Sequence, residues 1–160
     1  MQRMAAVLLA GVAGLVLVGL AVAGMNRNWS VHLGGELEVP IRDTDAQGQA
    51  IFQLSRDGET LTYRLITANI ENVTQAHIHL GAPGTNGGIV AWLYPSGPPL
   101  QLIPGRSDGV LATGTITASS LVGALAGQPL SALVDRLNAG TAYVNVHTTQ
   151  YPPGEIRGNF

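Results

Sequence analysis

Three of the four histidines lie in two short apolar segments of the chain. His77 and His79 stand one residue apart in AHIHL, and His147 belongs to YVNVHT near the C-terminus. Because side chains alternate along a strand, His77 and His79 leave the same face of their strand. Imidazole nitrogens are common ligands of Zn²⁺ and Cu²⁺. The three histidines therefore predict a candidate metal site.

Two carboxylates could complete such a site. Glu38 and Glu155 lie in predicted strands, over residues 29–39 and 154–160, that could converge with the histidines, and a carboxylate is a further ligand for zinc. The candidate metal ligands are thus His77, His79, His147, Glu38 and Glu155. The sequence requires no cofactor. If these residues bind a metal, zinc or copper is the ion that they would suit.

The same residues would also form a structural network without any metal. In that interpretation Glu155 pairs with Arg157 or Arg64, and the histidines bond backbone carbonyls. The network would hold the last strands in register. The sequence favours this second interpretation, and with it a domain without catalytic residues that needs no metal to fold.

Composition excludes several kinds of chemistry. The chain of 160 residues has no cysteine and no lysine, and its formal net charge is −2. It therefore has no disulfide, no thiolate nucleophile, no lysine Schiff base and no P-loop lysine. With no basic patch, nucleic acid is not an expected partner.

The elements that would position these residues are mostly strands. Two alternating runs flank Asp57-Gly58 and predict a hairpin. Further strands are predicted over residues 29–39, 73–80, 89–94, 110–118, 141–148 and 154–160. About eight short strands at regular spacing predict an all-β domain, either an antiparallel sandwich or a Greek-key barrel.

Alternation along these strands also predicts the core, and capping signals predict two short helices near residues 119–138. The expected core residues are Leu37, Phe52, Leu54, Leu61, Tyr63, Leu65, Ile78, Val90, Val144, Val146 and Ile156. One helix would follow Ser119 or Ser120, and another would have Pro129 in its first turn and close at Gly140.

The N-terminal segment is apolar enough to be a membrane helix. Residues 4–25 contain no charge, and roughly 20 such residues span the hydrocarbon core. Arg3 and the terminal amine outweigh Arg27, which predicts a cytoplasmic N-terminus. We expect a single-pass anchor over residues 1–27 in the inner (plasma) membrane. Residues 28–160 would then form a periplasmic or extracellular domain. The alternative is a signal peptide, cleaved after the AVA of residues 21–23.

Four blocks of the predicted ectodomain resemble the CHRD (chordin-type) domain family, in the family's order. The blocks are GGELEVP around residues 35–40, GQAIFQLSRDGETLTYRL at 48–65, AHIHLGAPGTNGGIV at 76–90 and YVNVHTTQYPPGEIRGNF at 143–160. The chain resembles a membrane-anchored member of bacterial type. The resemblance implies an antiparallel β-sandwich similar to immunoglobulin or superoxide dismutase domains. It implies no catalytic activity, and it does not explain the second helix at 129–138.

These observations favour a non-enzymatic, membrane-anchored interaction module. Its partners would be the lipid bilayer and subunits of a larger membrane complex, of a photosynthetic or respiratory type, which it would stabilise as an accessory subunit. One alternative is a metal-binding or redox protein of the cell envelope that uses His77, His79 and His147. The other is an exported binding domain, released by cleavage of the signal peptide.

Overall fold

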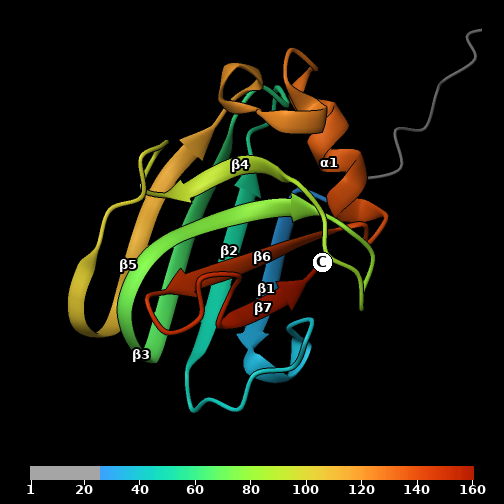
Figure 1. Cartoon of the computed structure of the whole chain (residues 1–160). Coiled ribbons are helices and arrows are strands. Elements are labelled where there is room, and N and C mark those ends of the chain that lie inside the picture. The colour runs from blue at the N-terminus through green and yellow to red at the C-terminus, as the bar shows by residue number, and fades with distance from the viewer. Residues whose placement is uncertain (1–25) are drawn as a thin grey trace, which may run out of the picture.

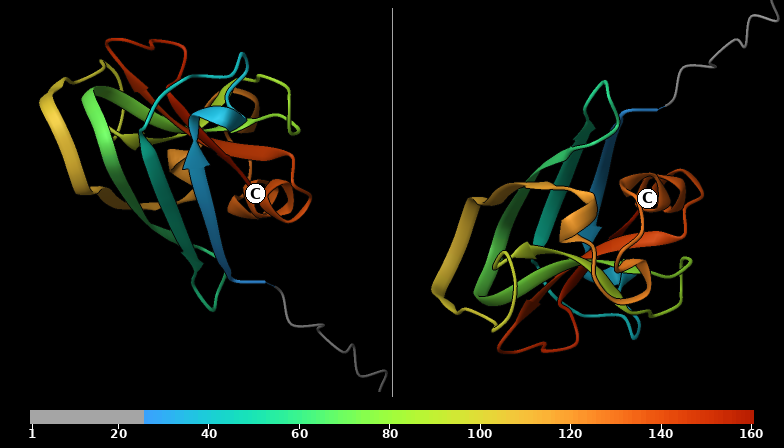
Figure 2. Two further views of the ribbon diagram at one scale, coloured as in Figure 1. Left: turned by 90° about the horizontal axis from the view of Figure 1, so that it is seen from below. Right: turned by 90° about the horizontal axis from the view of Figure 1, so that it is seen from above.

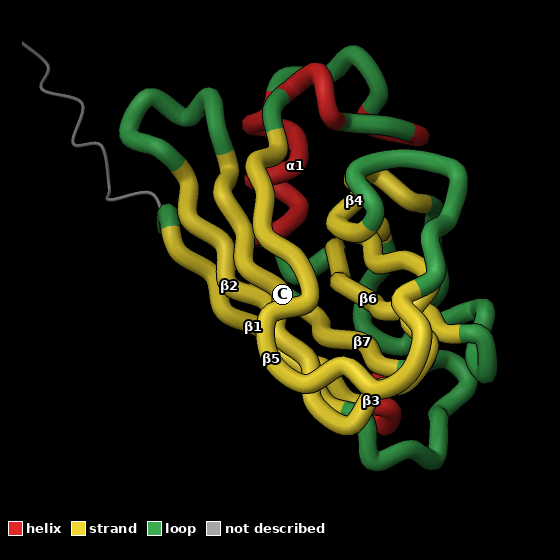
Figure 3. Tube along the Cα trace, turned by 90° about the vertical axis from the view of Figure 1, so that its left-hand side faces the viewer, coloured by secondary structure: helices red, strands yellow, loops and turns green. Residues whose placement is uncertain are grey.

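The fold was analysed in a computed structural model that describes residues 26–160, and it is an all-β domain with antiparallel pairing throughout (Figure 1). The strands of this part of the chain are β1 (Asn28–Gly34), β2 (Gln47–Leu54), β3 (Leu61–Leu80), β4 (Ile89–Tyr94), β5 (Ile103–Ile116), β6 (Ala142–Thr148) and β7 (Ile156–Asn159). The helical segments are α1 (Leu130–Asn138) and the 3₁₀ turns η1 (Gly35–Leu37), η2 (Ala118–Ser120) and η3 (Gly123–Leu125). Figure 3 shows how strand dominates the domain. The all-β prediction is confirmed.

The long strand β3 closes the sheet into a barrel. Its first half pairs with β2 and β5, and its second half pairs with β6 and β4. Between the halves, Asn69 and Asn72 adopt positive φ angles of 57° and 54°, a conformation that asparagine tolerates better than most residues. The strand bends there, as the green ribbon of Figure 1 shows.

Closure is completed where β1 meets β7, with Gly34 opposite Arg157. Strands β1, β2, β3, β6 and β7 thus form a five-stranded barrel, and β4 and β5 are added along β3. The expected two-sheet sandwich is not confirmed, because β3 belongs to both walls and joins them into one sheet. Seen along the vertical axis of Figure 1, β1 and β2 form one wall of the barrel, and β6 and β7 cross on another (Figure 2).

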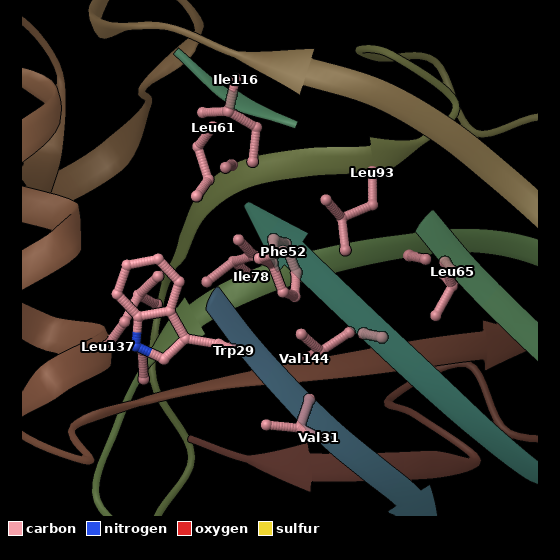
Figure 4. Packing of buried hydrophobic residues seen from close by; sticks show 14 of the residues in the cluster. Trp29, Val31, Phe52, Leu61, Leu65, Ile78, Leu93, Ile116, Leu137 and Val144 are labelled. Atoms are coloured by element: carbon pink, nitrogen blue, oxygen red, sulfur yellow. The ribbon is translucent and has the colours of Figure 1, made fainter. Parts of the chain in front are cut away.

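The barrel interior is filled by the apolar faces of these strands. Figure 4 shows Phe52, Leu65, Ile78 and Val144 meeting there. The predicted core residues are buried except Leu37 and Tyr63. Tyr63 is half-buried, and its hydroxyl donates to the Leu93 carbonyl at 2.8 Å.

Leu37 is a wrong prediction with a simple cause. The chain leaves β1 at Gly34 and turns into η1, where the expected strand would have continued to residue 39. Successive side chains are rotated by about 120° in a 3₁₀ turn and by about 180° in a strand, so the alternation is lost. Leu37 is 36% exposed, and Glu36 and Glu38 do not share a face: Glu36 is exposed and Glu38 is buried.

The helix expected to have Pro129 in its first turn is confirmed as α1. Its apolar residues recur with helical spacing and join the core; they are Leu130, Leu133, Val134 and Leu137. Gly140, with a φ of 65°, ends the helix. The Trp29 indole nitrogen donates to the side chain of Asn138 at 3.2 Å and connects α1 to β1. The other expected helix, after residue 120, is replaced by η2 and η3.

The predicted membrane anchor covers residues 1–27, of which residues 1–25 lie outside the described residues, as does the alternative signal peptide. Within residues 26–160, no helix is both long enough and apolar enough to cross a bilayer.

Candidate trihistidine site

The three histidines come together because β3 and β6 are neighbours in the barrel wall. His79 lies opposite Tyr143, and His77 lies opposite Asn145. His147 lies opposite Gln75, which places it diagonally from His77 on the same face. This face points away from the barrel interior, where Ile78 and its neighbours pack.

The ring nitrogens of the three histidines converge. One nitrogen from each of His77, His79 and His147 lies within 4.8 Å of the others. Nδ1 of His77 is 3.1 Å from Nε2 of His147. The predicted cluster of His77, His79 and His147 is therefore present in the structure.

Two of the rings are oriented by backbone carbonyls. Nδ1 of His79 lies 2.9 Å from the Gly87 carbonyl oxygen, and Nδ1 of His147 lies 2.8 Å from that of Pro152. A carbonyl oxygen can only accept, so each Nδ1 carries the proton and each Nε2 carries a lone pair. These carbonyl contacts match the structural interpretation of the sequence. They are also the arrangement that fixes the tautomer of metal-binding histidines.

Two of the nitrogens have no partner. Nε2 of His77 and Nε2 of His79 are buried and make no hydrogen bond within the described residues. A buried polar atom without a partner costs about 1 to 3 kcal/mol. A network that existed only to satisfy its own members would not leave these two atoms unpaired.

Burial keeps the three rings neutral. Burial, together with the neighbouring His147 and His79, lowers the pKa of His77 to about 3. Burial also lowers the pKa of His79 to about 4, and it lowers the pKa of His147. At neutral pH all three imidazoles are therefore uncharged, with one N–H and one lone pair each, and this is the form that binds a metal.

The loop of residues 81–88 covers one side of the site. Gly87 donates its N–H to the Tyr143 hydroxyl at 3.1 Å and accepts from His79. A Cβ at Gly87 would overlap the Leu80 carbonyl oxygen, so only glycine allows this approach. Of the glycines in the loop, Gly84 alone has a positive φ. The loop therefore depends on a close contact at Gly87 as well as on the turn geometry at Gly84.

Aromatic rings and a guanidinium enclose the histidines. The ring of Tyr143 stacks on His79 with centroids 4.9 Å apart, and Trp92 meets His77 edge-on at 4.3 Å. The guanidinium carbon of Arg157 lies 3.5 Å from the centroid of Tyr143. Arg157 thus forms the outer layer of a stack with Tyr143 and His79.

The two predicted carboxylate ligands do not join the cluster. Both oxygens of Glu155 are occupied, by the hydroxyls of Thr44 and Thr148 at 2.7 Å each. These threonines also replace the Arg157 or Arg64 partner that the structural interpretation expected, and that pairing is wrong.

Glu38 is buried near Asn145, beside the site rather than in it. A Cβ at Gly154 would lie 2.5 Å from Oε1 of Glu38 and 2.6 Å from Nδ2 of Asn145, so both side chains press on this glycine. Burial raises the pKa of Glu38, and Arg157 opposes the shift. Oε1 of Glu38 and Oδ1 of Asn145 are further buried atoms without a partner.

Comparison with protein families finds a match over residues 29–160 to the CHRD domain. The chain belongs to the CHRD domain family. The match spans the whole barrel and includes the three histidines. No curated protein matches the chain, and no solved structure does.

Sequence reasoning missed two residues of this CHRD domain that shape the site. Arg157 lies opposite Asn145 on the outward face of the barrel wall, and it is completely buried. It donates to the side chains of Asn159 and Asn86 and to the Ala82 carbonyl. Trp92 gave no signal because it lies in a uniformly apolar segment. The sequence signal for Arg157 was its position two residues after Glu155.

The fourth histidine lies apart from the site. His32 is on β1 and is exposed.

Proposed function

We propose that this CHRD domain binds one transition-metal ion through His77, His79 and His147. The observation that carries the proposal is the convergence of one ring nitrogen from each of three buried histidines within 4.8 Å, with Nε2 of His79 left without a partner. An ion would give Nε2 of His79 the partner that the protein does not supply, and it would replace the hydrogen bond between His77 and His147.

The spacing of the nitrogens supports the same conclusion. Two nitrogens bound to one ion at 2.0 to 2.1 Å lie about 3.3 Å apart when the geometry is tetrahedral. Nδ1 of His77 and Nε2 of His147 are 3.1 Å apart, close to that value, so the ion would take Nδ1 of His77. The carbonyls of Gly87 and Pro152 already orient the other two rings.

The proposed role is binding rather than turnover. His77 is 0%, His79 7% and His147 6% exposed, so a substrate has no open path to an ion held between them. The role of an accessory subunit in a membrane complex stays a prediction, because it rests on residues 1–25 and on partners outside the structure.

The test is metal content and affinity of the full chain in mild detergent. Protein purified without added metal, stripped with a chelator and titrated with Zn²⁺ or with copper, should bind one ion per chain. Changing His77, His79 or His147 to Gln should lower the affinity at least 100-fold, since each change removes one of three ligands.

His32→Gln is the matched control, because it removes an exposed histidine outside the cluster and should leave binding unchanged. Circular dichroism of each variant shows whether the barrel still forms. Folded wild-type protein that binds neither zinc nor copper would overturn the proposal. So would equal losses of affinity in His32→Gln and His79→Gln.

A further inference from the structure

The cluster offers three histidine ligands and no carboxylate. Among residues 26–160, no carboxylate joins the three histidines, and Glu155 is occupied by two threonine hydroxyls. Tyr143 and Trp92 wall the site with aromatic rings and leave the histidines almost without solvent contact. Zn²⁺ takes four ligands in nearly all protein sites, with water as the fourth when the protein gives three. A dry site with three nitrogens is better suited to an ion that is stable with three ligands.

The surroundings also lack the negative charge that a divalent ion needs. The three histidines are neutral ligands. The charged groups beside the site are one carboxylate and one guanidinium, Glu38 and Arg157, whose formal charges cancel. The buried Arg157 reaches the site through its stack on Tyr143 and His79.

Ion charge then decides which metal is held best. The cost of moving an ion from water into a low-dielectric site grows with the square of its charge, so it is roughly fourfold larger for a divalent than for a monovalent ion. Without a net negative shell, that difference is not recovered. Imidazole is a ligand for copper as well as for zinc.

Resting on the proposed metal-binding function, we infer that the trihistidine site selects Cu⁺ over Zn²⁺ and Cu²⁺. Cu⁺ carries one charge, accepts three ligands and needs no water molecule. The domain would thus hold copper in its reduced state.

Competition titrations of the full chain in detergent test this selectivity. Cu⁺ would be supplied without oxygen and with ascorbate, against a chelator of Cu⁺ such as bicinchoninate, and Zn²⁺ against a zinc-chelating dye. We expect one Cu⁺ per chain, bound at least 100-fold more tightly than Zn²⁺. X-ray absorption should show three nitrogen neighbours at about 2.0 Å.

The outcomes separate this inference from the proposed function. If neither ion binds, the proposed function fails and the inference fails with it. If Zn²⁺ binds as tightly as Cu⁺, for example with the Asn145 oxygen or a water as fourth ligand, only the selectivity is overturned.

Two substitutions of opposite sign test the electrostatic reason. Glu38→Gln makes the surroundings more positive and should raise the ratio of Cu⁺ to Zn²⁺ affinity. Arg157→Gln makes them less positive and should lower that ratio. Each shift should be roughly tenfold for one unit charge near the site. Structural damage alone would weaken both ions together and leave the ratio unchanged.

Arg157 is fully buried, so its variant could fail to fold. Arg42→Gln then takes its place, because Arg42 is half-exposed and also acts on Glu38. Ratios that stay the same, or that move in the reverse direction, in the folded variants would overturn the electrostatic reason.

Discussion

On the inward face of β6, Val144 and Val146 are surrounded by apolar side chains, whereas on the outward face Asn145 and His147 are surrounded by loops and polar groups. Both faces are almost equally removed from water, since every residue of β6 is buried. The inward contacts are non-directional, and each apolar atom gains from any close neighbour. The outward contacts are directional, and some of their atoms go without a partner.

This difference shows that burial alone does not identify the stabilising core. Removing the apolar side chains of the inward face from water stabilises the folded state. The outward face costs free energy unless each nitrogen and oxygen finds a partner. A dry polar layer with unpaired lone pairs is therefore better explained by a ligand than by stability.

The largest expected effect is the response of the metal-free protein to acid. The folded-state pKa values of His77 and His79 lie near 3 and 4, below 6.5 in the unfolded chain. Between about pH 6.5 and 4 the unfolded chain therefore binds more protons, and stability falls as the pH falls. The loss should be on the order of 1.4 kcal/mol per pH unit for each of these histidines.

Urea unfolding at pH 7, 6 and 5, with chelator present, measures this slope. His77→Gln should lower the slope of stability against pH by the contribution of about one proton. Val144→Ala, on the inward face, should leave this slope unchanged. Stability that does not change between pH 7 and 5 would contradict the account of the outward face.

The next effect concerns the inward face. Ile78→Ala should destabilise the domain by about 2 to 4 kcal/mol, because it leaves a cavity at a fully buried position of the barrel. Urea unfolding at neutral pH measures the change. Ile51→Ala, at a partly exposed position of β2, is the control and should cost less. A loss below about 0.5 kcal/mol for Ile78→Ala would mean that the two faces of β3 are reversed.

The smallest effect is expected at the edge of the polar layer. Gly154→Ala places a side chain at a φ of 130° and against Glu38 and Asn145. The strain should cost about 1 to 3 kcal/mol. Gly84→Ala is the matched control, because it has a positive φ of 79° but open space around it. Thermal unfolding compares the two, and a larger loss for Gly84→Ala would show that contact with the polar layer is unimportant.

Much of the site could be predicted from alternation. The pattern of AHIHL and YVNVHT placed Ile78 and Val144 inside and the three histidines on the other face, and the structure brings those histidines together. Such positions are predictable because a strand fixes the direction of each side chain.

The rest depended on contacts between distant segments. Glu38 was misplaced because η1 breaks the alternation, and Glu155 because two threonine hydroxyls donate to its oxygens. Barrel closure needed the pairing of Gly34 with Arg157, which no local pattern indicates. Burial of Arg157 follows from the way in which the loop of residues 81–88 covers it, and loop placement has no periodic signature.

Strand β6 has a further property that follows from its position. It has β3 on one side and β7 on the other, and both of its faces are covered. Backbone amides at its centre are thus shielded in every direction, and no fraying of an edge exposes them. Their exchange with solvent deuterium requires the barrel itself to open, so β6 reports the global unfolding equilibrium of the domain.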